Sequence, residues 1–438
     1  MQADWSIEAR WIIPVEPDGM VLEHHTLVVN AGRIVALLPT EEAREHYHPA
    51  QRKSLPNHVL IPGLVNAHTH AAMSLLRGIA DDRPLREWLQ DHIWPLEQKW
   101  VTDTFIRDGV DLALAEMIRG GVTCFNDMYF FPEVTARQSI RAGFRACVGM
   151  ILIDFPTNWA SSPEEYFAKG LALHDAMRHE PLITTLFAPH APYSVSDPVL
   201  LRMRTLAAEL DCPVTIHLHE TAHEIDESRQ HCGMRPLKRL QQLDLVGPQL
   251  VAVHMTQLDV AEITELAEAG ATVVHCPESN LKLASGFCPV DALLKAGVNV
   301  ALGTDGPASN NDLDLMGEMR TAALLAKAVA GDAAALPAHT ALRMATLNGA
   351  AALGLGSEIG SLERGKYADV AAVRMNDIET LPLYDPISDL VYSASRHQVT
   401  DVWIAGRQVL NERELTTLDV GEIRQKAETW RTKLMNRA

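Results

Sequence analysis

Two histidines one residue apart, His68 and His70, are the first residues in the sequence whose types and spacing could do chemistry. They close the apolar stretch Leu60–His70, which reads LIPGLVNAHTH and turns at Pro62-Gly63. Side chains two residues apart on a strand point to the same face, about 6–7 Å apart along it. Two imidazoles held in this way can bind one divalent metal ion. The pattern also fits two histidines in an ordinary loop, because short motifs occur by chance. The metal interpretation therefore depends on whether the rest of the chain supplies further ligands.

Polar residues also follow six later apolar stretches. A single histidine in such a place is more often packed or surface-exposed than a ligand. Polar residues at seven strand ends, counting His68 and His70, together predict a metal site with an acid or base beside it. After His68 and His70, they are Asn126 and Asp127, then His190, then His217, His219 and Glu220, then His254, then His275 and finally Asp305.

The apolar stretches are typical of buried parallel strands, which are hydrophobic on both faces. Helix-like segments separate them, for example Phe105–Arg119, Pro163–Arg178 and Pro198–Leu210. Eight strand-then-helix units predict an α/β protein with a (β/α)₈ TIM-like barrel, which gathers the C-terminal strand ends at one face. An open doubly wound sheet is the alternative, but it would carry a G-x-G-x-x-G turn, which this sequence lacks. The predicted strands are Leu60–Asn66, Val122–Asp127, Ala146–Ile153, Ile183–Ala188, Pro213–Leu218, Leu250–His254, Ala271–His275 and Val298–Gly303.

Strand-like alternation also appears at both ends of the chain. Trp5–Val15 and His25–Leu38 show it before the barrel, and Gly365–Met375 and Thr400–Leu410 show it afterwards. We therefore expect residues 1–59 and 366–438 to form one small β-sandwich domain beside a barrel of residues 60–365. A single helix is predicted over His339–Leu353.

Composition narrows the class of protein. The chain has 438 residues, 47% of them hydrophobic, and a formal net charge of −18, which repels phosphate backbones and anionic membranes. The six cysteines form no C-x-x-C pair, and the N-terminus lacks a signal-peptide pattern. No stretch approaches the roughly 18 apolar residues of a membrane span. We expect a cytoplasmic protein that acts on a small molecule and has no nucleic-acid or membrane partner.

Five segments, PGLVNAHTH, HLHE, VAVH, HCPESN and LGTDG, occur in this order, and they resemble the amidohydrolase superfamily over nearly the whole chain. The resemblance is closest to the branch of cytosine, guanine and adenosine-type deaminases with triazine chlorohydrolases. It implies that His68, His70, His217 and Asp305 bind Zn²⁺, with Fe²⁺ as the other candidate. Many members bridge two metals with a lysine after strand four. This chain has Pro189-His190 there, which favours one metal per chain.

The same resemblance implies a hydrolytic deaminase of adenine nucleosides such as 5′-methylthioadenosine, acting as a homo-oligomer. His254 and Asp305 would help to deprotonate a water, and Glu220 would protonate a ring nitrogen of the purine. Glu220 could instead be a charge at the start of a helix that begins near Ala222.

Substrate contacts are expected from the insertion Leu85–Trp100. Glu97 would accept both ribose hydroxyls, and Trp88 would pack on the substrate, although plain core packing explains Trp88 equally well. His190 would contact the purine or ribose, and Ser309 would add a hydrogen bond near the metal. Ile151–Ala160 contains none of the arginines with which relatives hold S-adenosylhomocysteine. This favours methylthioadenosine or adenosine as the substrate.

Two alternatives stay open. One is a guanine- or pterin-type deaminase or a triazine chlorohydrolase-like enzyme of the same superfamily. Glu97 separates these from a nucleoside deaminase, because free bases have no ribose to bind. The other is a scaffold that kept the barrel and lost the chemistry.

Overall fold

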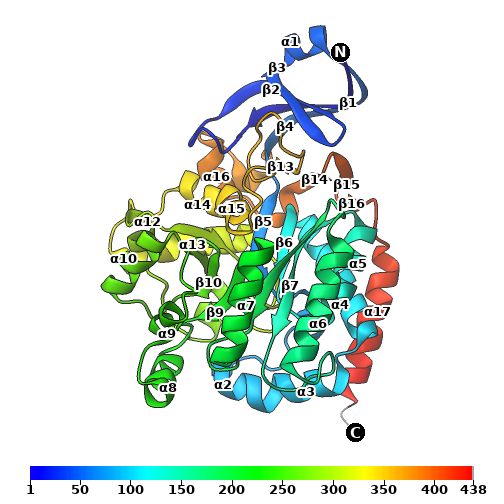
Figure 1. The fold of residues 1–438 in the computed structure, drawn as a ribbon. Coiled ribbons are helices and arrows are strands. Elements are labelled where there is room, and N and C mark those ends of the chain that lie inside the picture. Colours follow the sequence, from blue (N-terminus) through cyan, green and yellow to red (C-terminus); the bar gives the residue numbers. More distant parts are fainter. Residues whose placement is uncertain (437–438) are drawn as a thin grey trace.

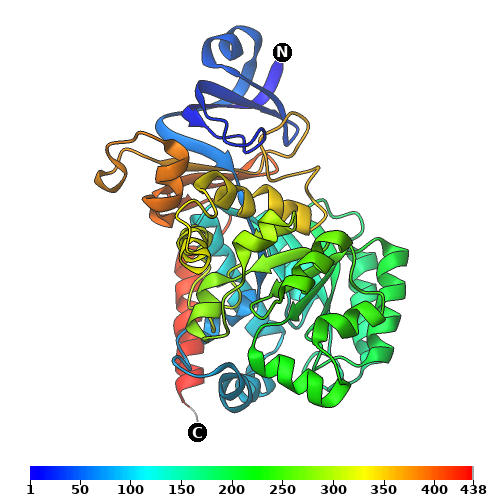
Figure 2. The same cartoon turned by 90° about the vertical axis from the view of Figure 1, so that its left-hand side faces the viewer.

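The computed structural model describes residues 1–436 and consists of a barrel with a smaller sheet domain at one end (Figures 1 and 2). Eight parallel strands follow one another in sequence order around the barrel, from β5 to β12. The predicted barrel is confirmed, and seven of the predicted strands differ from the observed ones by at most one residue at either end. The strands are β5 (Leu64–Thr69), β6 (Val122–Asp127), β7 (Arg145–Leu152), β8 (Ile183–Pro189), β9 (Val214–Leu218), β10 (Leu250–His254), β11 (Thr272–His275) and β12 (Asn299–Leu302).

The first predicted strand, Leu60–Asn66, is wrong at its start. Leu60, Ile61 and Pro62 end the strand β4 (His48–Pro62) of the other sheet, and β5 begins only at Leu64. Gly63 lies at the crossing between the two sheets, where a Cβ atom would stand 2.1 Å from the side chain of Thr123. Only glycine fits this close approach. Gly63 therefore allows one apolar stretch to leave the first sheet and continue directly into the barrel.

The first and last barrel strands, β5 and β12, meet through polar groups at the end that carries the predicted site. The Asn66 side-chain amide donates to the Thr304 hydroxyl at 2.8 Å, and the Thr304 backbone N–H donates back to the Asn66 oxygen at 3.0 Å. The backbone N–H of Asp305 donates to the carbonyl of His68 at 3.0 Å. These bonds place two predicted metal ligands side by side.

Helices cover the outside of the barrel (Figure 1). The predicted helix His339–Leu353 is two helices, α14 and α15, because the carbonyl of Ala345 accepts a hydrogen bond from Val65 of β5 at 2.8 Å. The barrel helices are α4 (Asp103–Arg119), α5 (Pro132–Ala142), α6 (Pro163–Met177), α7 (Asp197–Leu210), α8 (Ala222–Cys232), α9 (Pro236–Gln242), α10 (Val260–Ala269), α11 (Pro277–Lys282), α12 (Val290–Lys295), α13 (Leu315–Ala330), α14 (Ala338–Met344) and α15 (Leu347–Ala352).

The small domain is built from both ends of the chain, as predicted. Its eight-stranded mixed sheet has the order β16-β15-β14-β13-β4-β1-β2-β3. The rings of Trp5 on β1 and Trp403 on β14 lie 5.9 Å apart although three strand spacings of about 4.8 Å separate these strands in the sheet. The sheet therefore folds over on itself and encloses a core between its halves. The other bounds are β1 (Gln2–Ile12), β2 (Leu22–Asn30), β3 (Arg33–Pro39), α1 (Thr40–His46), β13 (Val370–Arg374), α16 (Pro386–Tyr392), β14 (Val399–Ile404), β15 (Arg407–Asn411) and β16 (Glu414–Leu415).

The last helix, α17 (Val420–Met435), lies along α4 of the barrel (Figure 1). The indole N–H of Trp430 donates to the buried carboxylate of Asp108 at 2.9 Å. Part of the range that we predicted for the small domain thus packs on the barrel, and the exact domain bounds remain a prediction.

Residues 85–100 form three consecutive helical segments after β5, which we call the lid. They are α2 (Leu85–Glu87), a π-helical turn (Trp88–Ile93) and α3 (Trp94–Trp100). The lid lies at the end of the barrel away from the small domain (Figures 1 and 2).

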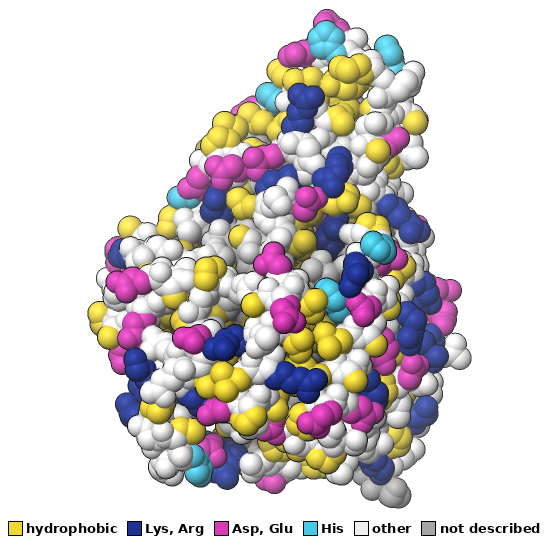
Figure 3. Space-filling view, in the orientation of Figure 1, with side chains coloured by type: hydrophobic (Ala, Val, Ile, Leu, Met, Phe, Trp, Pro, Cys, Tyr) yellow, Lys and Arg dark blue, Asp and Glu magenta, His cyan; other side chains and the backbone are white. Residues whose placement is uncertain are grey.

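The surface carries both signs of charge. On the face drawn in Figure 3, acidic side chains are interspersed with lysines and arginines. The described residues on this face form no continuous basic surface of the kind that binds nucleic acid. Within residues 1–436, no helix has the length and apolarity that crossing a membrane requires.

Candidate active site and metal centre

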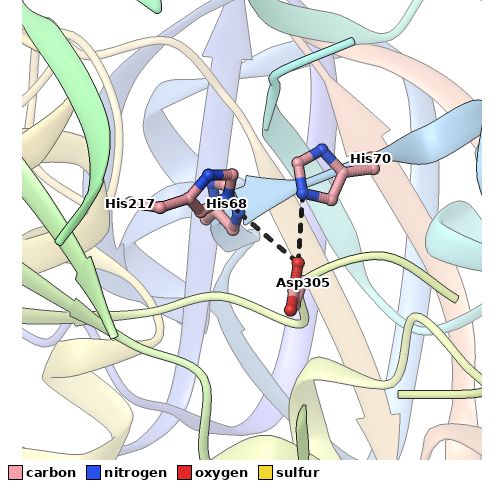
Figure 4. A group of neighbouring side chains, drawn as sticks. All are labelled: His68, His70, His217 and Asp305. Carbon is pink, nitrogen blue, oxygen red and sulfur yellow. Dashed lines mark hydrogen bonds and ion pairs between the residues drawn. The ribbon is translucent and has the colours of Figure 1, made fainter. Parts of the chain in front are cut away.

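Four side chains converge at the C-terminal end of the barrel (Figure 4). His68, His70, His217 and Asp305 each offer one ligand atom, and these atoms all lie within 4.8 Å of one another. Nε2 of His70 is 3.2 Å from Oδ1 of Asp305, and Nε2 of His68 is 3.5 Å from the same oxygen. Three imidazole nitrogens and a carboxylate oxygen are a donor set that suits Zn²⁺ or Fe²⁺. The structure thus brings together the four predicted ligands.

The outer atoms of three of these ligands are held by the surrounding protein, whereas Nδ1 of His68 is buried without a hydrogen-bond partner among the described residues. Nδ1 of His70 lies 2.6 Å from the carbonyl of Met128, and Nδ1 of His217 lies 2.8 Å from the carbonyl of His190. A carbonyl only accepts, so each Nδ1 carries a proton and Nε2 is the atom that each ring presents to a metal. Oδ2 of Asp305 accepts hydrogen bonds from Ser279 at 2.6 Å and Ser309 at 3.1 Å.

Burial keeps two of these imidazoles neutral. It lowers the pKa of His68 to about 4 and the pKa of His217 well below its ordinary value. Neutral imidazole is the form that binds a metal ion. Burial alone would raise the pKa of Asp305, but hydrogen bonds from His68 and His70 hold that pKa well below its usual range. His68 and His217 therefore keep their lone pairs and Asp305 keeps its negative charge at neutral pH. At His70, burial lowers the pKa but the neighbouring Asp305 carboxylate outweighs it, and the net effect is a raised pKa.

Glu220 and His254 stand beside the metal ligands. Nε2 of His254 is 3.8 Å from Oε2 of Glu220, and the two rings of His254 and His217 stack at 5.4 Å. Nδ1 of His254 donates to the amide oxygen of Asn280 at 2.9 Å, which leaves Nε2 free to accept a proton. Burial raises the pKa of Glu220. One buried base and one buried carboxyl group with a raised pKa can together move protons.

A cavity of about 300 Å³ opens above these groups. Its base is polar, and the side under the lid is apolar. The base contains His70, His190, His217, Glu220, His254, Asp305 and Ser309, and the lid contributes Leu85, Trp88, Leu89, Ile93, Trp94, Glu97 and Gln98. The ten residues to which we assigned a role in metal binding, catalysis or substrate binding line this cavity or belong to the metal cluster below it.

Glu97 is the one acidic group that the lid brings to the cavity. Its Oε1 accepts a hydrogen bond from the Tyr129 hydroxyl at 2.6 Å, and burial raises its pKa to about 7. Trp88 is 6% exposed and belongs to the main hydrophobic core as well as the cavity wall, so both of its sequence interpretations fit. Nδ1 of His190 pairs with the Ser194 hydroxyl at 2.9 Å.

Two predicted strand-end histidines do not reach the cavity. The imidazole of His219 accepts a hydrogen bond from the backbone N–H of Leu237 at 3.0 Å, and His275 is buried away from the cavity lining. Sequence reasoning in turn missed Tyr129, Ser279 and Asn280. Ser279 and Asn280 lie in the segment HCPESN, and Tyr129 follows Asp127 by two residues, so position just beyond a strand end was the available signal.

The sequence pattern of the amidohydrolase family matches residues 59–409. The chain belongs to the amidohydrolase family. The family match and the deaminases among its relatives confirm the prediction of a hydrolase that acts on carbon–nitrogen bonds.

Its relatives cover nearly the whole chain. A protein of Teredinibacter turnerae named 5-methylthioadenosine/S-adenosylhomocysteine deaminase is 52% identical over 98% of both chains. The crystal structure of an adenosine deaminase from Xanthomonas campestris with bound zinc is 56% identical, covers 99% of both chains and has a TM-score of 0.98. A zinc-bound atrazine chlorohydrolase from Arthrobacter aurescens has a TM-score of 0.91 at 22% identity, covers 97% of this chain and 99% of its own, and shares the fold.

Proposed function

We propose that this amidohydrolase removes the amino group of adenine nucleosides by hydrolysis, with 5′-methylthioadenosine as the preferred substrate and 5′-methylthioinosine and ammonia as products. The observation that carries the proposal is the cavity itself, where a four-ligand metal centre, Glu220 and His254 lie opposite Glu97 of the lid. The names of the close relatives support the same activity.

The protein's own groups provide the proton transfers. His68, His70, His217 and Asp305 would hold a zinc ion, which would lower the pKa of a bound water molecule toward about 7. His254, oriented by Asn280, accepts a proton from that water at Nε2. Glu220 gives its proton to the ring nitrogen beside the amine-bearing carbon. The water oxygen bonds to this carbon, the carbon–nitrogen bond breaks, and the amine leaves as ammonia with the proton that His254 held. The proton left on the oxygen returns to Glu220, so the product carries a carbonyl group and Glu220 is restored.

We propose one metal ion per chain, Zn²⁺ with Fe²⁺ as the alternative. The absence of a lysine after strand four supports this count, since Pro189-His190 occupies that place and His190 pairs with Ser194. Elemental analysis of the purified protein should find about one transition metal per chain. Two tightly held metals at full activity would contradict the mononuclear site.

We propose that Glu97 binds the ribose hydroxyls and that Trp88, His190 and Ser309 contact the nucleoside. The cavity near the lid is apolar, with Ile153 in its wall and the rings of Trp94 and Phe155 6.2 Å apart. No arginine is among the residues that line it in the described part of the chain. These observations favour a methylthio group over the charged amino-acid end of S-adenosylhomocysteine.

An ammonia-release screen tests the proposal. Methylthioadenosine should give the highest kcat/KM, followed by adenosine, and both should exceed S-adenosylhomocysteine, guanine and cytosine. Faster turnover of guanine would favour a free-base deaminase, and chloride release from a chlorotriazine would favour the chlorohydrolase alternative. A zinc-loaded protein that is inactive on the whole panel would point to a non-catalytic scaffold.

We also propose that the protein is a cytoplasmic homo-oligomer. Light scattering of the purified chain measures its mass, and a monomer at micromolar concentration would contradict the oligomer.

A further inference from the structure

The backbone just before Glu220 has a conformation that few side chains adopt. His219 has φ +52°, in the left-handed region, and it is the residue between the end of β9 and Glu220. A non-glycine residue in this region costs free energy and persists where its surroundings hold it. The turn directs the chain so that Glu220 lines the cavity while the His219 imidazole faces Leu237.

One carboxylate holds both N–H groups of this turn. Oε1 of Glu224 accepts from the backbone N–H of His219 at 3.1 Å, and Oε2 accepts from the backbone N–H of Glu220 at 2.7 Å. Thr256 holds the carbonyls on the other side, with its backbone N–H 3.0 Å from the His219 oxygen and its hydroxyl 2.6 Å from the Glu220 oxygen. Every backbone polar group of the two residues therefore has a partner.

We propose that Glu224 is a positioning residue that fixes Glu220 for proton transfer, an inference that rests on the proposed function. Glu224 is 6% exposed and lines a neighbouring cavity between the lid and α8, not the cavity above the metal ligands. It acts on the reaction through the Glu220 backbone and without touching the substrate.

Helix capping is the competing explanation. Thr221 is the N-cap of α8, and its hydroxyl accepts from the Glu224 N–H at 3.3 Å. In a capping box the third helical residue reaches back to the N-cap N–H. Here the Glu224 oxygens accept from the two residues before the cap. A capping role predicts a loss of stability only, whereas a positioning role predicts a loss of kcat.

The first variant is Glu224→Gln. Its amide has one acceptor oxygen, so one of the two buried N–H groups loses its partner. We expect kcat on methylthioadenosine to fall by about 10–100-fold, as for residues that orient catalytic groups, with KM and zinc content close to the parent. Glu224→Asp keeps both oxygens and should recover part of kcat. The control is Glu227→Gln on the same helix, whose carboxylate makes no hydrogen bond to this turn, and its kcat should not change.

A double-mutant cycle with Glu220→Gln decides the matter. If Glu224 acts through Glu220, adding Glu224→Gln to Glu220→Gln should change the residual kcat by less than about twofold. A full additional loss, or a Glu224→Gln variant that loses only melting temperature, would overturn the positioning role. If Glu220→Gln itself kept the parental kcat, the role of Glu220 in the proposed function would fail, and this inference with it. If Glu220→Gln loses kcat and Glu224→Gln does not, only this inference fails.

Discussion

The two sides of the cavity are built in different ways. On the barrel side, the ligands come from strand ends, and three of the four have a hydrogen-bond partner on the side away from the metal position. These partners are Met128 for His70, His190 for His217 and Ser279 for Asp305. On the lid side, one insertion of 16 residues, 85–100, supplies mostly apolar surface and a single acidic group.

The lid is tied down by few polar contacts. Asn158 donates to the carbonyls of Gln98 at 2.9 Å and Val101 at 3.0 Å at its end. Within the lid, Glu97 accepts from Tyr129 at 2.6 Å and Arg86 contacts His223 at 3.2 Å. Lys282 pairs with Asp81 at 2.6 Å just before the start of the lid. If the proposed function holds, we expect the barrel side to determine the reaction and the lid to contribute most to the choice of substrate. Substitutions on the barrel side should stop all substrates alike, and those on the lid side should distinguish between substrates.

The largest effect is expected from His217→Ala. It removes a nitrogen ligand from the centre, so zinc content should fall well below one per chain. Activity on every nucleoside should fall further than the roughly 10²–10⁴-fold that one acid or base contributes. Elemental analysis with ammonia release measures both. His275→Ala, at another strand end but outside the cavity, should keep its zinc, and retention of zinc by His217→Ala would contradict the ligand assignment.

Glu220→Gln should come next. The amide cannot deliver the proton, so kcat should fall by about 10²–10⁴-fold on methylthioadenosine and 2′,3′-dideoxyadenosine alike, while zinc stays bound. Steady-state kinetics on metal-loaded protein measures this. A loss of only a few-fold would show that another group protonates the purine.

Glu97→Ala should separate the substrates. Hydrogen bonds to a charged group contribute about 1.5–3 kcal/mol each, so kcat/KM on methylthioadenosine should fall at least roughly tenfold. The loss on 2′,3′-dideoxyadenosine should be much smaller, because that substrate has no diol. Equal losses on both would make Glu97 structural and would place a free-base deaminase first.

The smallest effect concerns pH. Burial raises the pKa of Glu97 to about 7, and the ionised carboxylate accepts two hydroxyls where the protonated one accepts less well. The ratio of kcat/KM for methylthioadenosine to that for 2′,3′-dideoxyadenosine should therefore rise, by up to roughly tenfold, as pH increases from 6 to 8. Taking the ratio cancels groups that act on both substrates. In Glu97→Gln the ratio should be flat, and a sloping ratio there would contradict the assignment.

The sequence predicts the barrel well because its strands are continuous apolar runs that end in polar residues. The metal ligands follow from those strand ends and from the family resemblance. Tyr129 stands just beyond a strand end, but its contact with Glu97 depends on where the lid lies. Glu224 carries no such signal, because its role depends on α8 reaching back to the turn after β9. The start of β5 and the break before α15 depend on contacts between distant segments, at Gly63 and Ala345, which local patterning does not contain.

The contact between β5 and β12 determines when, during folding, the metal ligands can come together. His68 and Asp305 are 237 residues apart in sequence, and the second of them exists in the growing chain only after the eighth strand has been made. The complete ligand set thus forms at the moment the barrel closes. An ion bound by these residues would connect the first strand to the last. Because it would bind only the closed barrel, its binding free energy would stabilise the barrel against separation of β5 from β12.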